Sequence, residues 1–126
     1  MNRSACVNDV LVAGSDDWVD MAEVAHVAKT VGGAATTTEA MRLSIEIVRE
    51  VVSSGLMKAG DVTLDGFHEW DLPVNEVLDR IEREWAVLRG LPKLGEICWL
   101  CSTEEGDNRA RQLAGGRGPG VQPGGR

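Results

Sequence analysis

Apolar residues in the segment 39–54 recur at the spacing of an amphipathic α-helix. They span an arc of about 200° around the helix, which is typical of a central helix. The opposite side alternates glutamate and arginine at spacings of three and four, a pattern that supports weak ion pairs. We expect Thr37 or Thr38 to cap its start and Gly55 to close its end in the left-handed conformation. The apolar positions are Ala40, Met41, Leu43, Ile45, Ile47, Val48, Val51 and Val52.

Two further segments show helical periodicity. The first is 15–31, with Ser15 or Asp17 as its N-cap and two glycines after its end. The second is 73–89, where Pro73 suits the first turn and Gly90 follows the last. Residues before 15 are expected to form a short lead without a helix.

Two segments favour strands. Residues 56–64 end at Asp65 and Gly66, a turn signal, and residues 96–102 hold a continuous bulky run typical of a covered strand. Residues 103–107 are expected to form a turn. The sequence therefore predicts an α+β fold: three main helices and a small two- or three-stranded antiparallel sheet, with the helix 73–89 inserted between the strands.

The chain of 126 residues is expected to form one globular domain over 1–108. Residues 109–126 contain six glycines and two prolines and little to bury, so they are expected to be a disordered Gly/Arg/Pro-rich tail. All 20 acidic residues but only nine of the 13 basic ones precede residue 109. The expected domain therefore carries a formal charge of −11.

This acidity argues against nucleic-acid binding, because affinity for phosphates comes largely from lysine and arginine. It suits a protein that is merely soluble and acidic, one that avoids nucleic acid, or one that is steered toward a basic protein partner. No apolar run reaches the roughly 18 residues of a membrane span, and the first 30 residues do not follow the pattern of a signal peptide. An odd number of cysteines, three, argues against a disulfide framework. We therefore expect a cytoplasmic protein.

Two segments, VREVVSSGLMKAGDVT (48–63) and ICWLCSTEEG (97–106), are similar to parts of winged-helix domains. The first resembles a recognition helix that continues into a wing strand, and the second resembles the returning wing strand with its turn. The resemblance implies a winged-helix-like fold and admits DNA binding by a transcriptional regulator. On the expected recognition helix, however, Arg42 and Arg49 each lie beside glutamates, which would repel phosphate.

Cys98 and Cys101 have the spacing of a metal knuckle or a redox pair. Zinc requires four ligands, and the remaining candidates, Cys6, His26 and His68, are distant in the sequence. Residues three apart in a strand point to opposite faces. We interpret both cysteines as structural, and we expect no metal and no cofactor.

The segment 67–71 gathers His68, Glu69 and Asp71 with two aromatic residues, in a position where loops often carry function. In the simplest interpretation, Phe67 and Trp70 anchor this segment to the core and the polar residues face water. Trp18 and Trp70 are the tryptophans that a partner would contact if they are exposed. The candidate partner-binding residues are Trp18, His68, Glu69, Trp70, Asp71, Glu104 and Glu105.

The sequence contains no catalytic motif, and we expect a protein that is not an enzyme. The leading hypothesis is an acidic protein-binding domain, either an antagonist or immunity-type protein or a regulatory adaptor. A winged-helix DNA-binding regulator is the alternative. A third hypothesis is an enzyme or metal-dependent protein that uses Cys98, Cys101 and His68.

Overall fold

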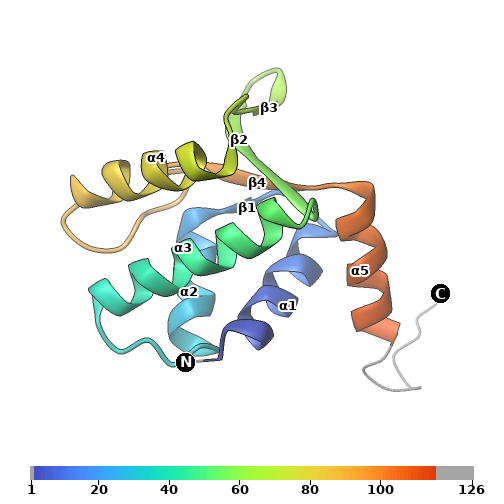
Figure 1. Ribbon diagram of the computed structural model, residues 1–126, viewed down its shortest axis with the longest axis horizontal. Helices are drawn as coiled ribbons and strands as arrows, with labels where there is room; N and C mark the ends of the chain where they lie inside the picture. The colour runs from blue at the N-terminus through green and yellow to red at the C-terminus, as the bar shows by residue number, and fades with distance from the viewer. Residues whose placement is uncertain (1, 116–126) are drawn as a thin grey trace.

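The computed structural model describes residues 2–115, and in this range the chain forms five helices and a four-stranded antiparallel sheet (Figure 1). The α+β class predicted from the sequence is confirmed, although the described residues form more elements than the three helices and two or three strands expected. The elements in chain order are α1 (Arg3–Gly14), β1 (Val19–Asp20), α2 (Met21–Thr30), α3 (Thr37–Ser53), β2 (Met57–Thr63), β3 (Gly66–Glu69), α4 (Val74–Ala86), β4 (Trp99–Ser102) and α5 (Glu104–Gly115).

The strands lie in the order β1-β4-β2-β3. Strand β4 pairs with β1 on one side, where Val19 is opposite Leu100, and with β2 on the other, where Ala59 is opposite Leu100. Strand β3 forms a hairpin with β2 and lies at the edge of the sheet. Both β3 and α4 therefore lie between β2 and β4 in the sequence, which confirms the expected helix between the strands.

The N-terminal region differs from the prediction of one helix over 15–31. Residues before 15 form α1, which Asn2 caps by accepting a hydrogen bond from the Ala5 N–H at 3.2 Å. Helix α2 begins only at Met21, because Asp20 rather than Ser15 or Asp17 is its N-cap. Strand β1 ends at this cap, so pairing with β4 fixes the point where the helix starts.

Helices α3 and α4 match the sequence prediction closely. Thr36 caps α3, one residue before the expected Thr37 or Thr38, and it forms a reciprocal capping box with Glu39. Gly55 has a φ of 76°, which confirms its expected left-handed conformation after the helix. Pro73 is the N-cap of α4.

Helix α5 overturns two predictions, the turn over 103–107 and the absence of structure from residue 109. The Thr103 hydroxyl accepts a hydrogen bond from the Gly106 N–H at 3.1 Å at the start of this helix. Ala110 is buried, and α5 lies beside α1 (Figure 1). A polar segment is thus held as a helix by packing against another helix, a contact that local sequence does not encode. The rest of the predicted tail, 116–126, lies outside the described residues.

One hydrophobic core joins the helices to one face of the sheet. Helix α3 contacts β2, and α1 contacts β4. Buried side chains from all these elements meet in a single cluster, which includes Val10, Val19, Ile47, Ala59, Ile81 and Leu100. This face of the sheet is therefore covered, and the other face carries the candidate functional surface.

Candidate protein-binding surface

The two faces of the sheet can be told apart by the burial of their residues. Val19, Leu100 and Ala59 lie side by side on three strands and are all buried, so they define the inner face. Successive residues of a strand point to opposite faces, and residues directly opposite each other share a face. Trp99 and Gly60, one position along, therefore belong to the outer face.

Two aromatic rings meet on this outer face. Trp18, just before β1, and Phe67, in β3, have ring centroids 6.4 Å apart and planes inclined by 34°. Phe67 leans across the strand beside it, because a Cβ placed on Gly60 would lie 2.8 Å from its Cζ atom. Trp18 is 37% exposed and Phe67 is half-buried, so the pair is accessible from solvent. We call Trp18 and Phe67 the aromatic pair.

The hairpin that carries Phe67 projects beyond the helices (Figure 1). At its turn the Thr63 hydroxyl lies 2.9 Å from Nε2 of His68 and accepts a hydrogen bond from the Asp65 N–H at 3.1 Å. Leu64, beside this turn, is fully exposed. Side-chain hydrogen bonds thus hold the turn while an apolar side chain extends into solvent.

Carboxylates surround the aromatic pair. Asp65 and Glu69 are exposed on the hairpin, and Asp16 and Asp17 are exposed just before Trp18. Asp61, between Gly60 and Val62 in β2, is exposed on the opposite face. The hairpin has one basic side chain, Lys58, whose Nζ lies 3.5 Å from Oε1 of Glu69. An accessible aromatic surface with a surplus of negative charge is suited to lysine and arginine side chains.

The structure brings several of the predicted residues together. His68, between Phe67 and Glu69 in β3, is exposed but points to the face opposite the aromatic pair. Glu69 is exposed on the same face as Phe67, and Asp71 is exposed two residues further along the chain. Trp18 joins them through its contact with Phe67. Sequence reasoning assigned Phe67 to the core; its half-buried position on the outer face depends on pairing between four strands and has no local signal.

Trp70 is buried, so it does not offer the exposed ring that its predicted contact with a partner requires. It is 6% exposed, and the Arg80 guanidinium lies 3.8 Å from the centroid of its ring. The backbone N–H of Trp70 donates to the Ala59 carbonyl at 2.9 Å. Trp70 therefore anchors the end of the hairpin to the core, as the simpler interpretation of this segment had it.

Glu104 and Glu105 lie away from the hairpin turn. They are exposed in the first turn of α5, and Thr103 just before them donates its N–H to the Leu56 carbonyl at 3.0 Å. That end of β2 is separated from the turn by the length of the strand, roughly 20 Å. These two glutamates are thus not part of the surface around the aromatic pair.

The two cysteines of the CxxC segment lie in different environments. Cys98 is buried, and this burial raises the pKa of its thiol far above the ordinary value. Cys101 is half-buried on the outer face, in β4. Within residues 2–115, no three histidine, cysteine or acidic side chains are grouped so that they could hold a metal ion.

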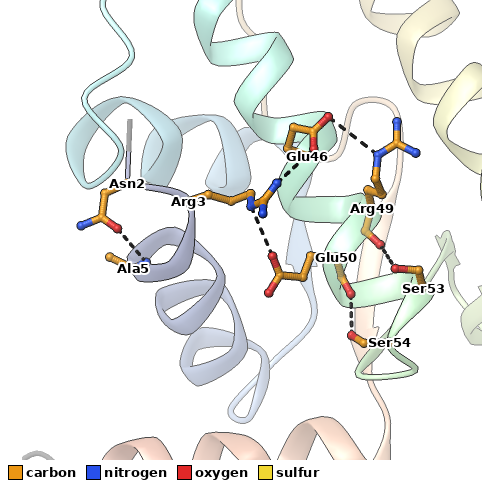
Figure 2. A network of polar contacts seen from close by, with 8 residues as sticks. All are labelled: Asn2, Arg3, Ala5, Glu46, Arg49, Glu50, Ser53 and Ser54. Atoms are coloured by element: carbon orange, nitrogen blue, oxygen red, sulfur yellow. Dashed lines mark hydrogen bonds and ion pairs between the residues drawn. The ribbon is translucent and has the colours of Figure 1, made fainter.

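Ion pairs occupy much of the solvent side of α3 (Figure 2). The Arg3 guanidinium lies between Glu46, at 3.3 Å, and Glu50, at 3.4 Å, and Arg49 lies 3.7 Å from Glu46. These contacts tie the start of α1 to the middle of α3. Arg49 is thus engaged by a carboxylate of its own helix.

A groove of about 510 Å³ lies next to this network, lined by Met41 and Ile45 of α3 and by Glu82 of α4. Arg42 and Glu46 complete its sides together with Thr38. Its lining carries both positive and negative side chains, so its charge does not favour a partner of either sign.

Comparisons of this chain with protein-family models, curated proteins and solved structures find no match. Among the described residues, no helix combines the length and the apolar character that crossing a membrane requires.

Proposed function

We propose that this chain is a non-catalytic protein-binding domain whose outer sheet face binds a basic partner. The observation that carries the proposal is the aromatic pair: Trp18 and Phe67 are in contact on a solvent-accessible face. Rings with an exposed surface act as anchors at protein interfaces because they bury a large area at a small cost in conformational entropy.

Charge supports a basic partner in particular. Carboxylates outnumber basic groups around the pair, and residues 1–108 carry nine basic and 20 acidic side chains. A field of one sign speeds encounter with a partner of the opposite sign and repels polyanions. An antagonist or immunity-type protein that masks the basic surface of its target, or a regulatory adaptor, fits this description.

We further propose a winged-helix-like architecture and a cytoplasmic location. Strands β1, β4 and β2 lie in that order beside the consecutive helices α2 and α3, which supports the architecture. All three cysteines, Cys6, Cys98 and Cys101, are free thiols, which suits a reducing compartment.

The same strand order favours a second candidate, a DNA-binding regulator that reads DNA with α3. Against it, Glu46 and Glu50 lie on the solvent side of that helix, and Arg49 pairs with Glu46. Carboxylates near phosphate reduce affinity, so we rank protein binding first.

Affinity capture from a native lysate, with and without nuclease, tests the proposal. We expect a stoichiometric protein partner that resists nuclease. Trp18→Ala should weaken its capture by about 30-fold or more, the effect of losing an interface anchor. A matched pair of charge variants locates the site: Asp65→Asn with Glu69→Gln at the hairpin, and Glu104→Gln with Glu105→Gln at α5.

The hairpin charge variant should weaken capture, and the α5 variant should leave it unchanged. Co-purification of DNA that is lost on nuclease treatment would favour the regulator instead. Equal capture by the wild type, Trp18→Ala and both charge variants would refute binding through this surface.

A further inference from the structure

Strand β3 has a free hydrogen-bonding edge. It pairs only with β2, where Glu69 is opposite Gly60 and Phe67 is opposite Val62. The hydrogen bond from the Trp70 N–H to the Ala59 carbonyl makes these two residues a hydrogen-bonded pair. Hydrogen-bonded pairs alternate along an antiparallel ladder. The backbone N–H and C=O groups of His68 therefore also point toward β2. The N–H and C=O groups of Phe67 and Glu69 consequently point away from the sheet.

Those four backbone groups form no hydrogen bond with any residue of 2–115. His68 and Glu69 are exposed, and the hairpin extends away from the helices (Figure 1). The opposite edge of the sheet offers no equivalent, since β1 is two residues long and leads directly into α2. Strand β3 is therefore the edge to which another extended segment can add.

We propose that a basic, extended segment of the partner adds to β3 as a fifth strand, an inference that rests on the proposed protein-binding function. The backbone of the segment pairs with the outward N–H and C=O groups of Phe67 and Glu69. Every second side chain then lies on the outer face, beside the Phe67 ring and the Glu69 carboxylate.

The negative charge of the hairpin indicates which kind of segment would add to the edge of β3. Asp65, Glu69 and, just after β3, Asp71 lie along this edge, and the hairpin has one basic residue, Lys58, which already pairs with Glu69. A second copy of this chain would place the same carboxylates against each other, and like charges on adjacent strands are destabilising. Arginine or lysine on the outward side of the added strand gains both the carboxylates and the aromatic ring.

The probe for a first test is a synthetic peptide of about eight residues, with arginine at every second position and threonine or valine between. Its control carries the same side chains with N-methyl groups on alternate amides, which removes strand pairing but keeps the charge. With ¹⁵N-labelled protein, we expect the parent peptide to slow amide exchange at Phe67 and Glu69, while the methylated peptide does not.

Two substitutions at one position separate the backbone from the charge. Glu69→Pro removes an outward N–H, and proline is tolerated on an edge strand where that group faces solvent. It should weaken peptide binding more than about tenfold. Glu69→Gln keeps the N–H and should weaken binding at most about fivefold. Thermal unfolding of both variants checks that the fold is kept, and the methylated peptide tests the same point without any substitution.

Equal binding of the parent and methylated peptides, or absence of binding at about 1 mM peptide, would refute strand addition. Dimers of the free protein that dissociate in Glu69→Pro would mean that a second copy occupies the edge, and would also refute it. The proposed function is tested separately: if Trp18→Ala still loses the captured partner while Glu69→Pro retains it, protein binding stands and strand addition does not.

Discussion

The carboxylate of Asp20 joins two segments that are 75 residues apart in the sequence. Its Oδ1 accepts a hydrogen bond from the Glu23 N–H at 3.0 Å, which caps α2, and its Oδ2 accepts one from the Gly95 N–H at 2.8 Å. Asp20 is only 4% exposed. One buried side chain thus fixes both the start of a helix and the loop that leads into β4.

Asp20→Ala should lower the free energy of unfolding by about 2 kcal/mol, because a cap and a second hydrogen bond are lost together. Asp20→Asn keeps one acceptor oxygen and should cost about half as much. Chemical denaturation measures both. Asp16→Ala, at an exposed position nearby, is the control and should change stability by less than about 0.5 kcal/mol. Equal losses in all three variants would contradict the role assigned to Asp20.

The capping box of α3 should make stability depend on pH. Hydrogen bonds from the Ala35 and Thr36 N–H groups hold the pKa of Glu39 below its ordinary value. A carboxyl with a lowered pKa in the folded state stabilises it above the unfolded pKa, and this contribution is lost as the pH falls through the folded value. The wild type should therefore be more stable than Glu39→Gln at neutral pH. This gap in stability between the two proteins should narrow below about pH 4.

Thermal unfolding across this pH range measures that gap. Glu82→Gln, an exposed substitution on α4, is the matched control and should show a much smaller gap. A gap for Glu39→Gln that stays constant with pH would contradict the assignment.

Gly60 makes room for the aromatic pair, and a side chain there should disturb it. A Cβ would lie 2.2 Å from the His68 carbonyl oxygen, a backbone atom that cannot move without altering the hairpin. Gly60→Ala should cost about 1–3 kcal/mol of stability and change the near-ultraviolet circular dichroism of the tryptophans. Gly115→Ala, where nothing lies within 4 Å of the new Cβ, should change neither.

The three cysteines should react at different rates with an alkylating reagent. Cys6 and Cys98 are buried, and burial raises the pKa of both thiols, so little reactive thiolate forms. Cys101 is half-buried and should be modified first in the native protein. Mass spectrometry after timed alkylation checks the order, with denatured protein as the control in which all three react. Early modification of Cys98 would contradict its placement in the core.

Local sequence patterns predicted the two central helices well. Helix α3 has a wide apolar face and a closing glycine, Gly55, and α4 has a clear periodicity after Pro73. Both features act within one or two turns of chain, so they are readable without knowledge of the fold.

The wrong predictions concern segments whose structure depends on contacts between residues that are distant in the sequence. Helices α1 and α5 lie against each other, and neither was predicted. The division of 15–31 into a turn, β1 and α2 depends on Asp20, which is held by Gly95 and by pairing with β4. A sequence window cannot contain such partners.

By itself, the sequence determined the acidic charge, the α+β class and the helices whose apolar faces repeat along the chain, since these follow from composition and short-range periodicity. Only the tertiary structure decided that Trp18 and Phe67 meet, that Trp70 is buried and that Glu104 and Glu105 lie far from the hairpin turn. The reason is physical: strand pairing joins residues that are distant in the sequence, and its register sets which face each side chain occupies.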